Sequence, residues 1–337
     1  MMNHSMKNQC KVNPGAIVQG KWHKHRYTIV KQLGFGANGI VYLAKRHHEY
    51  VALKMSENGM SITSEVNVLK SFAKVQGSAL GPSLLDVDDW EQNNGQISFY
   101  VMEYIQGPDF MSFIKQKGLS WLPVLILQLL SDLGQLHHNG WVFGDLKPEN
   151  LIVTGPPPRI RCIDVGGTTM QGRAIKEYTE FYDRGYWGLG SRKADPGYDL
   201  FAVAMIMINT AYPKRFTKTA GGIMQLRNQV QQSKELQKFE AVIIHALEGH
   251  YQSAEEMRND LLKYLSHVSG NRHTTGQQTS TQSRINRQKV SGQTGVKTNA
   301  SRQAKQKKQK KGSFVETFSL IMVVLLFYMF YIFGQLI

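Results

Sequence analysis

The chain has 337 residues, 42% of them hydrophobic, which is enough for a sizeable core in one large domain or two modest ones. Its two cysteines, Cys10 and Cys162, exclude a disulfide framework and favour a reducing, cytosolic compartment. The net charge of +15 is uneven, because eleven of the 40 Lys and Arg residues lie between positions 271 and 312, a stretch without Asp or Glu. Such an excess indicates an anionic partner and does not bear on the fold.

The start of the chain has no apolar run, so no signal peptide is expected there. Residues 24–267 then show the periodicity of packed structure. Alternating or apolar stretches predict strands at 26–33, 39–45, 50–56 and 97–105. Longer apolar patterns predict helices at 121–138, 199–212 and 253–267. Because strands come first and helices later, we expect an α+β fold with a strand-rich lobe followed by a helix-rich lobe.

Three glycines, Gly34, Gly36 and Gly39, lie between the first two predicted strands. A loop of this kind can fold over a polyphosphate, because the backbone approaches where side chains would block it. The same spacing at the start of a helix would indicate dinucleotide binding, but a strand-like stretch follows here. The loop is therefore predicted to bind nucleotide phosphates.

Lys54 lies within the apolar strand stretch "VALK". A buried ammonium needs a partner, and nucleotide phosphates together with a carboxylate would satisfy it. Glu65 is the preferred carboxylate, with Glu57 as the alternative. The simpler interpretation is a lysine that extends to solvent beside an exposed helical glutamate.

The stretch "FGDLKPEN" at 143–150 supplies Asp145, Lys147 and Asn150. Asp145 can orient an attacking hydroxyl or accept its proton, and Lys147 can neutralise the transferred phosphoryl group. Asn150 and Asp164, which follows in "CIDVGG", offer the oxygen ligands that Mg²⁺ prefers. Each motif alone has an ordinary explanation as a turn or strand end, but their common order does not.

This order of motifs resembles the bacterial protein kinases that look like eukaryotic Ser/Thr kinases, over residues 24–267. The resemblance implies a bilobal kinase fold, ATP and Mg²⁺ as cofactors, and transfer of phosphate to Ser/Thr hydroxyls of proteins. It also implies an adenine pocket formed by Val41, Ala52 and Ile152, with Met102 behind it and Glu103 to Ile105 at the hinge between lobes. Asp199 would be the buried Asp of the central helix.

Four positions depart from the pattern of that family. Gly144 replaces an Arg that often binds a phosphorylated activation loop, and Val165 replaces the usual Phe of Asp-Phe-Gly. Ala-Pro-Glu does not occur before Asp199, and His250 lies near the expected position of the Arg that pairs with that Glu. Two alternatives therefore stay open: a small-molecule kinase, which often has Gly before the catalytic Asp, and a pseudokinase scaffold.

Residues 268–312 are rich in Gln, Ser and Thr, and they bury too little apolar surface to offset chain entropy. They are predicted to be a disordered basic linker. Its charge favours a cytoplasmic flank for a membrane span, an anionic lipid surface, or DNA or RNA phosphates. The basic residues are Arg272, Arg284, Arg287, Lys289, Lys297, Arg302, Lys305, Lys307, Lys308, Lys310 and Lys311. We expect control of activity by anion binding here, weakened by autophosphorylation at Thr274, Thr275, Thr279, Ser280, Thr281 or Ser283.

Residues 317–337 carry no charge, and 21 residues of helix span about 31 Å, which matches one hydrocarbon core. This run predicts a single C-terminal transmembrane anchor with the kinase domain on the cytoplasmic face of the cell membrane; a core helix is the alternative. With the anchor included, the chain resembles the small tail-anchored Ser/Thr kinases of endospore-forming bacilli, which implies a role in spore development.

Two pairs of adjacent histidines, His47-His48 and His137-His138, lack further ligands at metal spacing. Surface and helix-end positions are therefore favoured over a zinc site.

Overall fold

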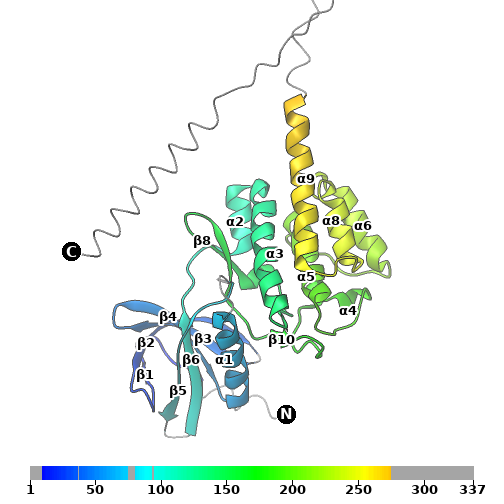
Figure 1. The fold of residues 1–337 in the computed structure, drawn as a ribbon. Helices are drawn as coiled ribbons and strands as arrows, with labels where there is room; N and C mark the ends of the chain where they lie inside the picture. Colours follow the sequence, from blue (N-terminus) through cyan, green and yellow to red (C-terminus); the bar gives the residue numbers. More distant parts are fainter. Residues whose placement is uncertain (1–9, 37, 75–79, 93–94, 275–337) are drawn as a thin grey trace, which may run out of the picture. The chain divides into compact units, whose positions relative to one another are not determined.

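The computed structural model describes residues 10–36, 38–74, 80–92 and 95–274. They form a strand-rich N-terminal lobe followed by a helical C-terminal lobe (Figure 1), which confirms the predicted α+β class. The predicted anchor at 317–337 and nearly all of the predicted linker lie outside the described residues.

The N-terminal lobe is built on a six-stranded antiparallel sheet with the strand order β1-β2-β3-β4-β6-β5, and helix α1 packs beside it (Figure 1). Its elements are β1 Ile17–Gln19, β2 Arg26–Gly36, β3 Gly39–Arg46, β4 Glu49–Ser56, α1 Gly59–Lys74, β5 Leu84–Gln92 and β6 Gly95–Glu103. Alternate residues of β2 and β3 are buried in a hydrophobic core of the N-terminal lobe, among them Tyr27, Ile29, Tyr42 and Ala44. The period of two seen in the sequence is therefore the period of burial.

The C-terminal lobe is helical, with four short strand segments around the catalytic loop among the residues described. Its longer helices are α2 Phe110–Lys117, α3 Leu122–His138, α5 Pro196–Ala211, α6 Gly222–Gln232, α8 Glu240–Leu247 and α9 Ala254–Thr274. The shorter ones are α4 Arg184–Trp187 and α7 Lys234–Gln237. The strand segments are β7 Trp141–Val142, β8 Leu151–Thr154, β9 Arg159–Cys162 and β10 Thr169–Met170.

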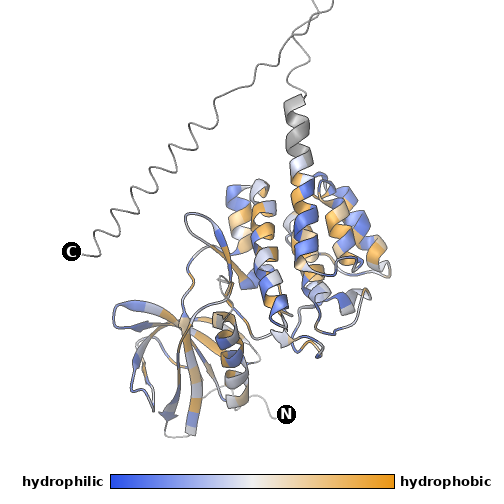
Figure 2. Cartoon of the chain, viewed as in Figure 1, coloured by the Kyte–Doolittle hydropathy of each residue, from blue (hydrophilic) through white to orange (hydrophobic). Residues whose placement is uncertain are grey.

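The central helix of this lobe is α5, which is buried without a break from Tyr198 to Asn209. A helix that is apolar on all sides must be surrounded by protein, as the sequence predicted for this stretch. By contrast, the N-terminal part of α9 carries both apolar and polar residues (Figure 2), as expected of a helix with one face in solvent.

Within the described residues, 119–138 is the one helical stretch long and apolar enough to cross a membrane. It contains α3, and 56% of its most apolar window is buried inside the lobe. The high hydropathy of this stretch is therefore explained by its packing in the core of the lobe.

The folded part of the chain is longer than the predicted 24–267 at both ends. Strand β1 pairs with β2, and Cys10 and Val18 belong to the core of the N-terminal lobe. Helix α9 begins after Ser253, whose Oγ accepts the N–H of Glu256 at 3.2 Å, as the capping pattern predicted. The helix ends at Thr274, so the backbone stays helical seven residues past the expected boundary.

Candidate active site

A cavity of about 380 Å³ lies between the glycine loop and the segment that joins the two lobes. Most of the predicted nucleotide-binding residues line it: Gly34, Gly36, Gly39, Val41, Ala52, Lys54, Met102, Glu103, Ile105, Asn150, Ile152 and Asp164. Val41 and Ala52 come from neighbouring strands of the sheet, whereas Ile152 comes from β8 in the other lobe. The structure therefore brings together residues that lie more than a hundred positions apart.

Lys54 and Glu65 meet in the wall of this cavity. Lys54 Nζ lies 2.6 Å from Glu65 Oε2, and both side chains are more than nine-tenths buried. Tyr100 donates its hydroxyl to the same carboxylate oxygen at 2.8 Å. Burial raises the pKa of Glu65, while the Lys54 ammonium and the Tyr100 hydroxyl oppose that rise. Glu57, the alternative partner, makes no such contact within the described chain.

Asp199 of α5 fixes the backbone of the catalytic loop through hydrogen bonds. This fully buried carboxylate accepts the backbone N–H of Phe143 at 2.7 Å and of Gly144 at 2.9 Å. It also lies 2.9 Å from His137 Nε2. His137 lies in the last turn of α3, which agrees with the predicted helix-end position, and its side chain is buried.

Gly144 has a backbone reason to be glycine. Its φ of +86° lies in the left-handed region, and a Cβ there would come within 2.6 Å of the Gly167 carbonyl oxygen. An arginine at this position would require the Asp164 loop to move. The absence of the Arg is thus part of the way the two loops pack against each other.

The side chain of Asp145, which follows Gly144 in the catalytic loop, lies beside those of Lys147 and Thr179. The Lys147 ammonium contacts one Asp145 carboxylate oxygen, and the Thr179 hydroxyl donates to the other at 3.0 Å. Lys147 Nζ also lies 3.1 Å from Thr179 Oγ1. Asn150 donates its amide to the Asp145 carbonyl at 3.0 Å, which leaves its amide oxygen free for a cation. Sequence reasoning missed Thr179, because it lies outside every motif, 34 residues from Asp145.

Asp164, the other predicted metal ligand, also lines the cavity. Its Oδ1 lies 4.0 Å from Lys54 Nζ and accepts the N–H of Gly166 at 2.9 Å, and its side chain is 52% exposed. A half-exposed carboxylate opposite the Asn150 amide is a donor set that suits a hard divalent cation. Val165 is buried in the main core, so the smaller side chain at this position still packs as an apolar residue.

Two further contacts at the cavity were not predicted. Glu103 pairs with Arg161 through both guanidinium arms, at 3.0 and 2.8 Å, which ties the segment between the lobes to β9. Burial acts to raise the pKa of Glu103, but the bonds from Arg161 and Ser83 lower it overall. At the other end, Glu177 lines the cavity and its carboxylate accepts the amide of Asn38 from the glycine loop.

The segment 183–195 has its own ion pairs where Ala-Pro-Glu was expected. Arg192 Nη2 lies 2.7 Å from Asp183 Oδ2, and Arg184 Nη2 lies 2.6 Å from Asp195 Oδ2. His250 lies away from them, 3.8 Å from Glu248 and against the ring of His245. The missing Glu–Arg pair is replaced here by pairs formed within the segment itself.

Phosphoryl transfer needs bound phosphates, an oriented hydroxyl and cations placed around the moving group, and this cavity places residues for each. The molecule is thus a kinase in its class. The protein kinase domain family matches residues 27–283, which is most of the chain, and the chain belongs to that family.

Named relatives place it among the bacterial Ser/Thr kinases of eukaryotic type. The chain is 58% identical over 265 residues to serine/threonine-protein kinase YabT of Bacillus subtilis, covering 78% of each protein. It is 26% identical over 197 residues to serine/threonine-protein kinase PknD of Mycobacterium tuberculosis, covering 57% of this chain and 26% of that protein. It is 31% identical over 135 residues to serine/threonine-protein kinase cek1 of Schizosaccharomyces pombe, covering 38% of this chain and 10% of that protein.

The chain is therefore a serine/threonine protein kinase. Protein kinases use ATP and a divalent metal, generally Mg²⁺, and they act on proteins. Of the alternatives raised by the sequence, the small-molecule kinase and the pseudokinase are both disfavoured, since these relatives are named as protein kinases.

Proposed function

We propose that this enzyme transfers the γ-phosphoryl group of ATP to Ser/Thr hydroxyls through the residues that surround the cavity between its lobes. The observation that carries the proposal is the buried Lys54–Glu65 pair with Asp164 at 4.0 Å from the same ammonium. Lys54 would hold the nucleotide phosphates, and Glu65 fixes the position of Lys54. Gly34, Gly36 and Gly39 would cover those phosphates with backbone.

The catalytic loop has the complementary role. Asp145 would orient the acceptor hydroxyl and receive its proton, and Lys147 would neutralise charge on the group in transfer. Thr179 holds the Asp145–Lys147 pair by bonding to both side chains. Asn150 and Asp164 would bind Mg²⁺, which when present offsets the negative charge of the phosphates.

Replacing Lys54 by Met tests this assignment. We expect phosphate transfer to a generic basic protein to fall at least about 100-fold, because one cation facing the phosphates is removed. Lys31→Met is the matched control, since Lys31 is exposed on β2 and does not line the cavity. Transfer that persists in Lys54→Met, with thermal stability unchanged, would contradict the assignment.

We further propose that the chain is held at the cytoplasmic face of the cell membrane by 317–337, with 268–312 as a basic linker. Support comes from composition alone: the stretch 271–312 has eleven basic residues and no acidic one, and after Glu316 an uncharged run of 21 residues follows. The linker would bind anionic lipid or nucleic acid and so regulate the kinase. The resemblance to the tail-anchored kinases supports a role of the enzyme in spore development.

A truncation series tests both segments. The full chain is expected in the membrane pellet after alkaline carbonate washing, and residues 1–312 in the supernatant. Residues 1–312 should bind duplex DNA or vesicles containing phosphatidylglycerol, with an affinity that falls steeply with salt, and 1–274 should lose most of that binding. A full chain that washes off the membrane would exclude the anchor. Equal binding by 1–312 and 1–274 would exclude the role of the linker.

A further inference from the structure

A second hollow, of about 450 Å³, lies on the N-terminal lobe at the end of the β2–β3–β4 sheet where β3 turns into β4. Four cationic side chains line it, together with two histidines and the hydroxyl of Thr28. The cations and histidines are Lys24, His25, Arg26, Lys45, Arg46 and His47. We call this site the basic groove.

The groove is separate from the nucleotide cavity. Strand β3 runs from Gly39 at the glycine loop to Arg46 at the groove. Seven steps of about 3.3 Å place the two ends of β3 roughly 23 Å apart. A ligand in the groove therefore does not touch the groups that carry out phosphate transfer.

The cations of the groove lack direct carboxylate partners in the described part of the chain, and Asp86 reaches Arg46 only through His25. Within the described residues, none of the four cations has an acidic group at ion-pair distance, whereas Arg161, Arg184 and Arg192 each pair with one. Glu49 lies opposite Arg46 in the β3–β4 register but forms no ion pair with it in this part of the chain. Four like charges around one hollow repel one another unless an anion is bound.

One cation and one histidine of the groove have an unusual backbone conformation. Lys24 and His47 have φ values of 60° and 52°, and they are two of the three non-glycine residues with positive φ among those described. Lysine rarely adopts this conformation, and such positions persist where the surrounding structure imposes them. Both flank the groove.

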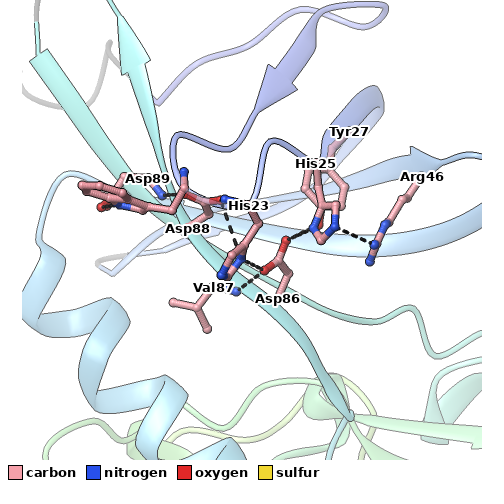
Figure 3. A network of polar contacts seen from close by, with 9 residues as sticks. His23, His25, Tyr27, Arg46, Asp86, Val87, Asp88 and Asp89 are labelled. Atoms are coloured by element: carbon pink, nitrogen blue, oxygen red, sulfur yellow. Dashed lines mark hydrogen bonds and ion pairs between the residues drawn. The ribbon is translucent and has the colours of Figure 1, made fainter.

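A network of hydrogen bonds that is centred on the buried Asp86 positions His25 and Arg46 at the groove (Figure 3). Arg46 Nη2 donates to His25 Nε2 at 3.0 Å, so His25 carries its proton on Nδ1 and donates it to Asp86 Oδ2 at 2.8 Å. Tyr27 donates to the same oxygen at 2.5 Å, and His23 Nδ1 lies 2.6 Å from Oδ1. Asp86 is 7% exposed, so the network is anchored in the lobe.

This arrangement argues against a metal at His23, His25 and Asp86, although their ligand atoms lie within 4.8 Å of one another. A metal at His25 Nδ1 would need the proton on Nε2, where Arg46 already donates. The network instead fixes the Arg46 guanidinium at the groove.

We propose that the basic groove binds the phosphate groups of phosphorylated Ser/Thr side chains on a protein partner. A phosphoserine or phosphothreonine carries a charge of about −1.5 to −2, so two of them balance the four cations. The hollow suits compact phosphates better than a flat bilayer. Among the described residues, the ring side chains that line it are two imidazoles, and the neighbouring Tyr50 ring already lies against Lys45 Nζ, 5.9 Å from the ring centroid. The groove therefore offers no free broad face for nucleic-acid bases. The ligand class is also the product class of this enzyme family.

The test uses the full chain in detergent at 0.15 M salt. The probe is a fluorescein-labelled peptide with two adjacent phosphothreonines, compared with its unphosphorylated twin by fluorescence anisotropy. We expect binding of the phosphorylated peptide to weaken at least about tenfold in Arg26→Glu/Lys45→Glu. The control is Lys31→Glu/Lys70→Glu, which reverses two exposed charges of the same lobe outside the groove and should change affinity less than about twofold. Transfer to a generic substrate should be unchanged in both.

The comparison between variants isolates the groove, because any contribution from the basic linker is common to all of them. If charge reversal unfolds the protein, Arg26→Gln/Lys45→Gln replaces it, with a loss of at least about threefold expected. The proposal fails if the two peptides bind equally or if the control weakens binding as much. It also fails if the groove variant changes affinity only for duplex DNA or phosphatidylglycerol vesicles. Because catalysis by Lys54 is assayed separately, failure here leaves the proposed active site intact.

Discussion

Asp145→Asn is expected to lower kcat by about 10²–10⁴-fold while leaving the fold intact, because the amide keeps the shape of the carboxylate but cannot accept the proton of the acceptor hydroxyl. The structure indicates that this substitution removes the proton acceptor without disturbing neighbouring contacts. Asp145 is only partly buried, and its side chain contacts Lys147 and Thr179, both of which have other partners or access to solvent. The measurement is steady-state phosphate transfer to protein, with thermal unfolding as the check on folding.

Asp109→Asn is the control for loss of one negative charge in the same lobe. Asp109 accepts the N–H of Ser112 at the start of α2, and Asn caps a helix about as well as Asp. Activity should therefore stay within about twofold of the parent. An Asp145→Asn enzyme that retains more than a tenth of the parental kcat would show that Asp145 positions the substrate without accepting its proton.

The pattern of the sequence predicted most of the fold that positions this site. Strands β2, β3, β4 and β6 follow from alternation and β-branched runs, and α3, α5 and α9 follow from apolar periodicity and caps. Strand β5 was missed because its stretch "DVDDW" reads as polar. Two of its three aspartates, Asp86 and Asp88, are buried. They accept bonds from His23, His25, Tyr27 and the backbone of Trp22. Those partners lie about sixty residues away, and no local pattern reveals them.

The residues of the candidate site likewise fall into those that the sequence predicted and those that it did not. Residues within motifs, such as Lys54, Asp145 and Asp164, could be named from spacing, because phosphate chemistry restricts which residue types can serve there. Thr179, Glu177 and Arg161 could not, since each acts through one long-range contact and belongs to no short motif. From the sequence, Gly144 was interpreted as the loss of an Arg and as a feature shared with small-molecule kinases. Its positive φ and the nearby Gly167 carbonyl show a backbone constraint that sequence alone does not contain.

The segment that replaces Ala-Pro-Glu gives the largest expected effect on stability. Asp183 is 0% exposed and accepts four hydrogen bonds: from the N–H groups of Gly185 and Tyr186 at the start of α4, from the Tyr198 hydroxyl and from Arg192 Nε. It also forms an ion pair with Arg192 Nη2 at 2.7 Å. Asp183→Ala removes both the cap of α4 and the buried acceptor for Tyr198. We expect it to lower the free energy of unfolding by about 2–4 kcal/mol.

Urea unfolding followed by tryptophan fluorescence measures this loss, because Trp187 is buried in the same helix and reports its packing. Asp109→Ala serves as the matched control: it also removes an N-cap carboxylate, but from a partly exposed position on α2, and should reduce stability by about 1 kcal/mol. The difference between the two variants is the contribution of burial and of the bonds to Tyr198 and Arg192. If both lose the same amount, these internal contacts contribute nothing beyond helix capping. The segment would then be stabilised by its aromatic packing, in which Phe181 and Trp187 meet Phe216, and the missing Glu–Arg pair would have no polar replacement.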